Sequence, residues 1–453
     1  MKKINFFILL SLSLIVIGGC GTQKAEWTYL FNGKDLGGWI QKNGDAPYEV
    51  VDSAIVGMSV LNTPNSFLCT EKYYGDFILE LEFKVDENLN SGVQIRSNSV
   101  PEYMDGRVHG YQVEIDPSPR AYSGGIFDEA RRGWIYAPVE NQKAQNAFKN
   151  NEWNKYHIEA IGDTIKTWLN DVQVAYLVDD MTDTGFIALQ VHTIYDSSQV
   201  GAQVMWKNIR IATDNFDQFK KKEEMTIKQV NLIPNTLTEW EKEKGYELLF
   251  EDASTEKWRG AHMEDFPEFG WVAEDGILTV LESGGAESQH GGDIVTKDEY
   301  TDFEFMLEFK LTEGANSGIK YYVTEGYDSK GSAIGLEYQL LDDKNHPDAK
   351  LGSHEGSRTL ASLYDLIKAE NKRFRGINEW NRARIVSKGD HVEHWLNGIK
   401  VLEYDRNTDA FEQLVQESKY KEFENFGKWE KGHILLQDHG NEVSFRSIKI
   451  REL

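Results

Sequence analysis

The feature that most constrains the fold of this 453-residue chain is an internal repeat with a period of about 220 residues. The segments 74–84 and 300–310 match in order and spacing, and each is followed by an Asn-Ser-Gly step. Three further matches keep the same order: Asn-Glu-Trp-Asn at Asn151 and Asn378, Trp-Leu-Asn at Trp168 and Trp395, and Gln-x-His at Gln190 and Gln437. The period is far longer than that of a solenoid, about 20–50 residues. The repeat therefore predicts two tandem copies of one domain.

Within each copy the hydrophobic residues recur with period two, as in β-strands. Phe77, Leu79, Leu81 and Phe83 alternate with Ile78, Glu80, Glu82 and Lys84, and the segments 204–211 and 443–450 have the pattern of closing strands. Asn397-Gly398 lies between two apolar runs and predicts a hairpin turn, and Asn170-Asp171 takes that position in the first copy. Many short strands separated by turn residues predict an all-β fold of antiparallel sheets packed as a sandwich.

A charged segment separates the two copies. Lys220-Lys221-Lys222-Glu223-Glu224 is typical of a solvated linker, and Thr238-x-x-Glu241 has the form of a helix capping box. We therefore expect a first domain over residues 20–213, a short, charged and partly helical linker over 214–240, and a second domain over 241–453.

The N-terminus has the features of a secretory signal. Lys2 and Lys3 precede an apolar run over 4–17, which is followed by Gly18-Gly19-Cys20. This end resembles a bacterial lipobox, so residues 1–19 are expected to be a signal peptide and Cys20 to carry lipid; the alternative is a plain signal peptide. Cys69 then has no intramolecular partner, and its apolar surroundings in the sequence favour a small core residue over a nucleophile.

The composition excludes several classes of protein. There are 49 Lys and Arg against 74 Asp and Glu, a formal net charge of −25. Nucleic acids and anionic membranes bind clustered cations, so neither is expected as a partner, and contact with a membrane is expected through the lipid anchor alone. The two cysteines of the whole chain exclude a disulfide scaffold and a Cys-rich zinc site.

In the first copy, large polar residues share strand faces because alternate side chains point the same way. These shared sets are Gln112, Glu114 and Asp116; Gln190 and His192; and Gln94 and Arg96. A solvated outer face is the default explanation for any one such strand. Planar amides, carboxylates and cations near aromatic residues instead favour a concave sugar-binding site.

The second copy repeats this pattern with changes. Glu337 and Gln339 share a strand face, and Asp342 follows just beyond them. Lys320 and Tyr322 replace Gln94 and Arg96 of the first copy. Gln437 and His439 match Gln190 and His192. A following loop adds His346, His354 and Arg358. Its Asp and Asn residues are typical of turns. Calcium binding is the alternative, although no spacing there matches a ligand pattern.

These segments resemble a known family. Five segments resemble motifs of the family of domain of unknown function DUF1080, which is described as 3-keto-disaccharide hydrolases. They are Phe31-Asn32-Gly33-Lys34-Asp35 through Trp39, the Asn-Ser-Gly step, the segment 337–343, Ser362-Leu363-Tyr364-Asp365 and Gly376-x-x-Glu379-Trp380-Asn381. The resemblance covers nearly all of the mature chain, twice, and the second copy is the closer match. It implies two concanavalin-like jelly-roll sandwiches and activity on 3-keto-glycosides.

That substrate class gives the polar residues a chemical role. A carbonyl at C3 acidifies the proton at C2, so a base can remove it and the C1 substituent can leave. The candidate catalytic residues are His439, His192, Glu114, Glu337, Lys320 and Arg96. The candidate substrate-binding residues are Gln112, Asp116, Gln190, Gln339, Asp342, His346, His354, Arg358, Tyr364 and Gln437.

Other possibilities remain at this point. A divalent metal ion near the segment 342–354 could replace the cation, and Glu114 with Asp116 could act in ordinary two-carboxylate hydrolysis, ranked second. The leading expectation is a glycoside-cleaving lipoprotein of the cell envelope, on the outer membrane facing the periplasm, that acts after a separate sugar 3-dehydrogenase. The alternatives are a non-catalytic carbohydrate-binding lipoprotein, or one catalytic and one binding domain.

Overall fold

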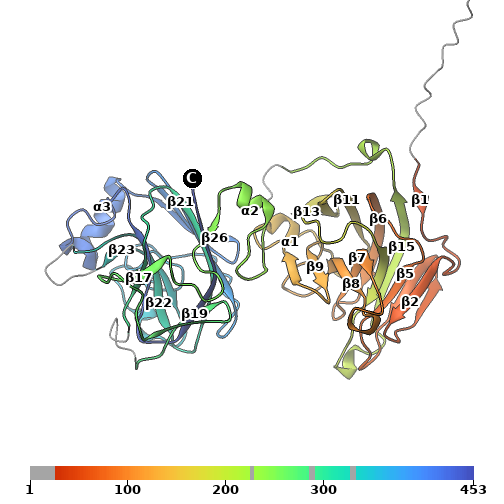
Figure 1. Cartoon of the computed structure of the whole chain (residues 1–453), viewed down its shortest axis with the longest axis horizontal. Coiled ribbons are helices and arrows are strands. Elements are labelled where there is room, and N and C mark those ends of the chain that lie inside the picture. Colours follow the sequence, from red (N-terminus) through yellow and green to blue (C-terminus); the bar gives the residue numbers. More distant parts are fainter. Residues whose placement is uncertain (1–25, 225–228, 285–290, 327–332) are drawn as a thin grey trace, which may run out of the picture.

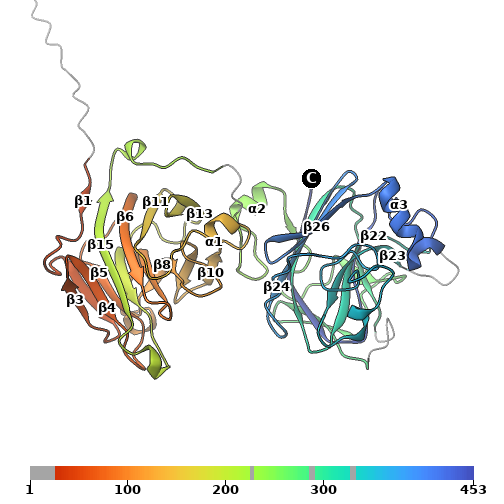
Figure 2. The same ribbon diagram turned by 180° about the vertical axis from the view of Figure 1, so that it is seen from behind.

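A computed structural model describes residues 26–224, 229–284, 291–326 and 333–453. The chain forms two β-sandwich domains that lie side by side along the long axis of the molecule (Figure 1), and the view from behind shows the same separation (Figure 2). The predicted all-β class with two tandem jelly-roll domains is confirmed. The expected signal peptide and Cys20 lie outside the described residues. Among the described helices, none has the length and apolar character needed to cross a bilayer.

The first domain consists of two antiparallel sheets. The first sheet has the order β13 (Val172–Val178), β12 (Thr164–Leu169), β11 (Asn154–Ile161), β6 (Phe77–Val85), β15 (Gln203–Ala212), β4 (Ala54–Met58) and β3 (Tyr48–Val51), with β1 (Thr28–Tyr29) also on β15. The second has the order β10 (Gly133–Tyr136), β9 (Ile126–Glu129), β8 (His109–Ile115), β7 (Ser91–Asn98), β14 (Phe186–Val191), β5 (Ser66–Thr70) and β2 (Trp39–Asn43).

The second domain repeats this topology with fewer strands. One sheet has the order β18 (Trp271–Glu274), β19 (Ile277–Val280), β28 (Val443–Glu452), β21 (Phe303–Leu311), β24 (Asn381–Lys388), β25 (His391–Leu396) and β26 (Ile399–Asp405), with β16 (Glu247–Leu248) on β28. The other has the order β17 (Trp258–Gly260), β20 (Ile294–Thr296), β27 (His433–Leu436), β22 (Asn316–Thr324) and β23 (Ile334–Leu341).

Each domain has its own hydrophobic core between its two sheets, because one face of each strand is apolar. Phe77, Leu79, Leu81 and Phe83 of β6 are all buried in the first core, as the alternation predicts. Cys69 of β5 is fully buried in a small neighbouring cluster, and burial raises the pKa of its thiol to about 12. A thiol with this pKa is not a nucleophile near neutral pH.

A β-bulge in each domain changes the expected alternation. The pairing of β7 with β8 shifts register after Ile95, and Arg96 has a φ of 46°. Tyr322 takes the same place in β22, with a φ of 53° and a register shift after Tyr321. A bulge re-aims the side chain that it contains. The prediction that Arg96 shares a face with Gln94 is therefore wrong, because the two side chains have separate partners: Arg96 binds the Gly75 and Gly162 carbonyls, and Gln94 binds Gln112.

The helices are short and lie between strands. They are α1 (Gln142–Gln145), α2 (Glu239–Glu243) and α3 (Asp409–Gln416), with single 3-10 turns η1 (Met104–Gly106), η2 (Ser197–Gln199), η3 (Phe216–Gln218), η4 (Pro347–Lys350) and η5 (Lys419–Glu422). The capping box predicted at Thr238 and Glu241 is present at the start of α2. The connection from β26 to β27 holds α3 and η5, whereas its counterpart from β13 to β14 spans only residues 179–185.

The two domains touch through the predicted hairpin turn of the second. A side-chain Cβ at Gly398 would collide with the backbone carbonyl of Val139 in the first domain. Arg375 donates to the Tyr122 hydroxyl at 3.0 Å, and Arg384 lies 3.9 Å from Glu140. These contacts place the turn between β25 and β26 against the first domain, beside α1.

Candidate active site

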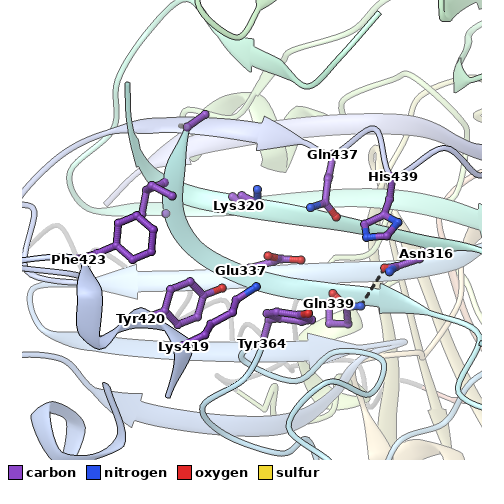
Figure 3. A pocket seen from close by; sticks show the side chains of 13 residues that line it. Asn316, Lys320, Glu337, Gln339, Tyr364, Lys419, Tyr420, Phe423, Gln437 and His439 are labelled. Carbon is purple, nitrogen blue, oxygen red and sulfur yellow. Dashed lines mark hydrogen bonds between the residues drawn. The ribbon is translucent and has the colours of Figure 1, made fainter. Parts of the chain in front are cut away.

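A pocket of about 250 Å³ opens on the outer face of the five-stranded sheet of the second domain (Figure 3). Six predicted site residues meet there from separate segments of the chain. The lining residues are Asn316, Lys320, Ala333, Ile334, Gly335, Glu337, Gln339, Tyr364, Lys419, Tyr420, Phe423, Gln437 and His439.

The Asn-Ser-Gly step builds the floor of this pocket. Asn316 accepts a hydrogen bond from the Gln339 amide at 3.0 Å, and the Ser317 hydroxyl donates to the Gln437 carbonyl at 2.9 Å. Gly318 lies beside Glu337, whose Oε1 would be 2.5 Å from a Cβ added at the glycine. Real Cβ atoms do not approach oxygen this closely, so the glycine leaves the space that the carboxylate occupies. Each residue of the motif therefore has a separate structural role.

Opposite charges meet on neighbouring strands at the centre of the pocket. Lys320 of β22 is the cross-strand partner of Glu337 on β23. Glu337 is only 5% exposed. The Lys320 ammonium also lies 3.8 Å from Asp293. Cross-strand neighbours on one face are close enough to interact, so the carboxylate is held next to a cation in a largely dry site.

One wall comes from the segment between β26 and β27. The Lys419 ammonium lies 4.2 Å from the ring centroid of Tyr364 and 5.2 Å from that of Tyr420. Removal from water lowers the pKa of Lys419, the nearby Glu337 carboxylate opposes this shift, and the Lys320 and Arg358 cations add to it. Tyr364, Tyr420 and Phe423 form an aromatic surface, and such surfaces stack on the C–H faces of sugar rings.

A buried carboxylate holds this wall in place. Asp365 is fully buried and accepts hydrogen bonds from the Lys419 backbone at 3.1 Å, from Ser353 and from Arg358 at 2.8 Å. Burial alone would raise the pKa of Asp365, but these hydrogen bonds keep it below its ordinary value. Arg358 also binds Asp348, which in turn accepts from the Tyr364 hydroxyl. Arg358 therefore lies behind Tyr364 and is absent from the pocket lining.

His439 lies at one edge of the pocket with His346 beside it. Their ring centroids are 6.2 Å apart and the rings are nearly perpendicular. Burial, and then the neighbouring His439, lowers the pKa of His346. Asp342 caps the turn that leads to His346, since its carboxylate accepts from the backbone of Gly314 and Lys344 and from the Asn345 amide. His346, Asp342 and His354 are outside the pocket lining.

The matching face of the first domain is a closed chain of hydrogen bonds. Gln94 donates to Gln112 at 2.7 Å, Gln112 donates to Glu114 at 2.8 Å, and Asn90 donates to the other Glu114 oxygen at 2.6 Å. Gln94, Gln112 and Glu114 are all at most 4% exposed. Burial raises the pKa of Glu114 to about 7. In sheet register Gln112 corresponds to Glu337 and Glu114 to Gln339, so acid and amide are exchanged between the domains.

Of the other residues predicted in the first domain, Asp116 and His192 both line one surface hollow, and Arg96 has its partners elsewhere. Arg96 bonds to backbone carbonyls and to Asp76 at 3.0 Å, and Asp116 binds Arg120 at 2.8 Å. Gln190 is fully buried, and its amide has no hydrogen-bond partner among the described residues. His192 lies in the wall of two surface hollows. The structure thus brings six predicted residues together in the pocket of the second domain, and divides those of the first between the hydrogen-bonded chain, a surface hollow and the partners of Arg96.

Comparison with known proteins decides the family. The model of a family described as the 3-keto-alpha-glucoside-1,2-lyase-like domain matches residues 26–212 and 245–451, which together are most of the chain. The chain belongs to this family. The resemblance inferred from the sequence is therefore confirmed, in both copies. Membership makes the protein an enzyme of the hydrolase type with a small-molecule sugar as substrate.

Three individual proteins illustrate what the chain is similar to. A 3-keto-disaccharide hydrolase of Bacteroides thetaiotaomicron is 36% identical over 230 residues, which cover 46% of this chain and 79% of that protein. A solved structure from Parabacteroides distasonis, provisionally named a glycosyl hydrolase, is 32% identical, covers 49% of this chain and 99% of its own, and has a TM-score of 0.43. A carbohydrate-binding module of Bacillus subtilis is 20% identical, covers 39% of this chain and 95% of its own, and has a TM-score of 0.29.

Seven of the thirteen lining residues were not among the predicted site residues, and three of the seven lie in the segment between β26 and β27. Lys419, Tyr420 and Phe423 have no counterpart in the first copy and belong to no shared motif. The signal was the unequal spacing of the repeat, because the stretch between Trp-Leu-Asn and Gln-x-His is longer in the second copy. An extra segment in one of two duplicated domains is a candidate for a change of function.

The carboxylates of the Asp-rich loop, where a divalent metal ion was one alternative, already have hydrogen-bond or ion-pair partners. Asp342 accepts from backbone N–H groups, Asp343 binds Lys372 at 2.6 Å and Asp348 binds Arg358 at 2.9 Å. A metal ion in this loop would have to break those bonds. A separate exposed group of His391, Glu393 and Glu403 has a metal-like spacing, but Lys400 lies 3.1 Å and 2.6 Å from its two carboxylates.

Proposed function

We propose that the pocket of the second domain cleaves the glycosidic bond of 3-keto-glycosides after removal of the proton at C2. The observation that carries this proposal is the make-up of the pocket. Among the described residues that line it, Glu337 is the one carboxylate, and it lies with Lys320, Lys419 and His439. Hydrolysis by two carboxyl groups needs a pair about 5–9.5 Å apart, which this lining does not supply. The name of the Bacteroides relative supports a keto sugar as the substrate.

The proposed reaction uses groups of both signs. Glu337 or His439 takes the C2 proton, and the electron pair left behind moves to the C3 oxygen as an enolate. Lys320 and Lys419 stabilise that negative charge in a site with little water, where such contacts are strongest. When the carbonyl re-forms, the C1–O bond breaks and its electron pair leaves with the aglycone oxygen, which takes up a proton. Water then adds across the new C1=C2 bond and completes the net hydrolysis.

The lowered pKa of Lys419 fits a role in this sequence. An ammonium group whose pKa lies below its ordinary value gives up a proton more readily, so Lys419 is suited to protonate the leaving oxygen. The aromatic wall of Tyr364, Tyr420 and Phe423 binds the sugar ring and holds it over Glu337 and Lys320.

The test is a comparison of a 3-keto-disaccharide with the same disaccharide unoxidised. We expect release of sugar from the keto form alone, and a slower rate when C2 carries deuterium. Glu337→Gln and Lys320→Met should each lower kcat by about 100-fold or more, because each removes a group that acts on the transition state. Equal cleavage of both disaccharides, with no isotope effect, would contradict the proposal.

The first domain supplies the matched control for the histidine. His192 corresponds to His439 in the repeat but lies in the other domain. His439→Ala should lower turnover, while His192→Ala should leave it within about twofold of the parent enzyme. Loss of turnover in both variants would show that the first domain takes part in the reaction.

We also propose the cellular setting that the sequence suggests. Residues 1–20 favour a lipid anchor on Cys20 and a place on the outer membrane facing the periplasm, and the keto substrate requires an upstream sugar 3-dehydrogenase. Mass spectrometry of the mature N-terminus checks the anchor, with an acylated Cys20 expected and an unmodified one contradicting it.

A further inference from the structure

A groove crosses the first domain on both sides of His192. Two surface hollows, of about 1000 Å³ and 750 Å³, meet there, and both are lined by His192, Thr193 and Tyr195. Each is larger than the 250 Å³ pocket of the second domain. Two adjoining hollows of this volume suit a ligand of several units more than a single sugar ring.

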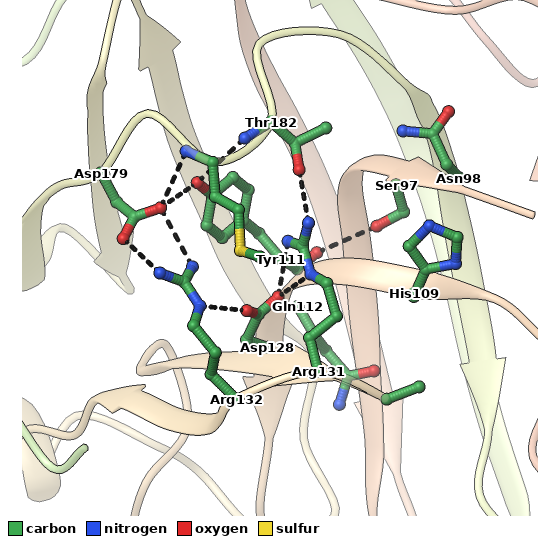
Figure 4. A network of polar contacts seen from close by, with 12 residues as sticks. Ser97, Asn98, His109, Tyr111, Gln112, Asp128, Arg131, Arg132, Asp179 and Thr182 are labelled. Atoms are coloured by element: carbon green, nitrogen blue, oxygen red, sulfur yellow. Dashed lines mark hydrogen bonds and ion pairs between the residues drawn. The ribbon is translucent and has the colours of Figure 1, made fainter. Parts of the chain in front are cut away.

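The groove is unlike a second copy of the reacting pocket. Gln94 stands where the second domain has Lys320, and the short connection over 179–185 has no counterpart of Lys419. That connection is instead held down by ion pairs, since Arg132 binds both Asp128 and Asp179 (Figure 4). The strand face that would hold the catalytic groups is closed by the chain of hydrogen bonds through Gln94, Gln112 and Glu114. The first domain therefore lacks the means to remove a C2 proton by the route proposed for the second.

The wall of the larger hollow contains a buried carboxylate whose own contacts are long. Glu129 is 4% exposed. Its Oε1 lies 3.4 Å from the Asn65 amide and 3.5 Å from Arg107. Burial raises the pKa of Glu129, and the cationic Arg107 opposes this. A carboxylate, an amide and a guanidinium at one place can accept and donate hydrogen bonds to the hydroxyl groups of a sugar.

An exposed aromatic ring lies where the two hollows join. Tyr195 is 81% exposed, more than any other large hydrophobic side chain among the described residues, and Met104, which also lines the larger hollow, is 57% exposed. A ring exposed in this way, in the wall of a polar groove, is free to stack on a ligand. The ring offers a flat apolar face, and the neighbouring polar groups offer hydrogen bonds, which is the combination that a sugar needs.

The negative charge of the chain makes an anionic polymer an unfavourable ligand for this groove. A net charge of −25 repels polyanions such as nucleic acids and acidic glycans. Acidic and basic side chains both line the larger hollow, with Asp105 and Glu129 near Arg107 and Arg131. A neutral oligosaccharide fits both observations.

We propose that the first domain binds a neutral oligosaccharide along this groove without cleaving it. It thereby holds glycan close to the second domain, where the keto form reacts. The choice of glucose-containing sugars as probes rests on the proposed function. The assignment of the groove as a binding site is independent of that function.

The test is isothermal titration calorimetry with the full mature chain carrying Glu337→Gln, which lowers turnover in the second domain, so that a heat of binding that depends on Tyr195 is assigned to the groove. The probes are the unoxidised disaccharides and tetrasaccharides of glucose in α-1,4, β-1,4 and β-1,3 linkage. We expect at least one series to bind, with the tetrasaccharide tighter than the disaccharide. Tyr195→Ala should weaken that binding by about tenfold or more, since aromatic contacts are frequent hot spots of binding.

A matched control separates the groove from general effects on the domain. Tyr29 is also an exposed tyrosine, at 61%, but it lies on β1 of the opposite sheet. Tyr29→Ala should bind the sugar as the parent does, and all variants should unfold at the same temperature, because both rings are largely in solvent. A second variant, Glu129→Gln, should also weaken binding.

The outcomes separate this proposal from the proposed function. The absence of binding for every probe, or unchanged binding in Tyr195→Ala, would overturn the binding role even if the 3-keto substrate is turned over. Binding that depends on Tyr195 supports the role even if no 3-keto substrate reacts, in which case the catalytic proposal alone fails.

Discussion

At the scale of single residues, a missing side chain decides where the reacting carboxylate lies. Gly318 has an ordinary extended backbone, so its requirement is for space and not for an unusual φ. Glu337 lies across that space, beside Lys320 on the neighbouring strand. Gly92 makes the same room for Gln112 in the first domain. The glycine of the Asn-Ser-Gly step therefore positions whichever polar residue faces it.

The glycine pair gives a prediction with a built-in control. Gly318→Ala should displace the Glu337 carboxylate by a fraction of an ångström or more and lower kcat on the order of 100-fold, as misplaced catalytic groups do. Gly92→Ala introduces the same steric conflict in the first domain and should leave kcat within about twofold. Steady-state kinetics on a 3-keto-disaccharide measures both. Similar losses in both variants would show that the glycines act through stability.

How far single residues could be predicted depends on whether the strand is regular. Glu337 and Gln339 lie on one face of β23 as alternation predicts, and both line the pocket. Arg96 was expected on the same face as Gln94, but the bulge after Ile95 sends it to backbone carbonyls. A bulge depends on pairing with a distant strand, which the local pattern does not contain.

At the scale of elements, a buried aspartate ties one loop to the sheet in each domain. Asp365 holds the segment of η5 through the Lys419 backbone and Arg358. Asp128 takes the same position in the first domain and, through Arg131 and Arg132, holds the connection over 179–185. Both domains therefore have the buried aspartate, but the segment that it holds in place differs: the segment of η5 in the second domain and the short connection over 179–185 in the first. The shared anchor could be predicted from the repeat, but the fold of the longer segment and its position over the pocket could not, because those depend on tertiary packing of Phe411 and Val415.

The anchors give a second paired prediction. Asp365→Asn and Asp128→Asn should each lower the free energy of unfolding by about 1–3 kcal/mol, because each weakens buried charge-assisted hydrogen bonds. Only Asp365→Asn should also lower kcat/KM, by about tenfold, since it loosens the wall that carries Lys419. Urea denaturation and kinetics at a temperature where both variants are folded measure the two effects. An unchanged kcat/KM in Asp365→Asn would show that the wall keeps its place without this anchor.

At the scale of the whole molecule, the hairpin turn of the second domain is also its contact with the first. Asn397 and Gly398 have φ values of 48° and 80°, and the matching turn has Asn170 and Asp171 at 48° and 68°. The turn itself therefore tolerates a side chain at its second position. What requires glycine at 398 is the nearby carbonyl of Val139.

This difference between turn and contact makes the arrangement of the domains testable. Gly398→Asn should preserve the hairpin, because asparagine tolerates a positive φ, and should push the domains apart at Val139. We expect a larger radius of gyration in small-angle X-ray scattering, with unchanged turnover and near-ultraviolet circular dichroism. Asp171→Asn is the control, since it places asparagine at the corresponding turn position, where the described residues show no contact with the second domain. The Asp171 carboxylate pairs with Lys221 of the connecting segment, and the scattering of this variant should match the parent. A Gly398→Asn curve identical to the parent curve would mean that the other contacts, among them those of Arg375 and Arg384 and of the connecting segment, keep the arrangement of the domains.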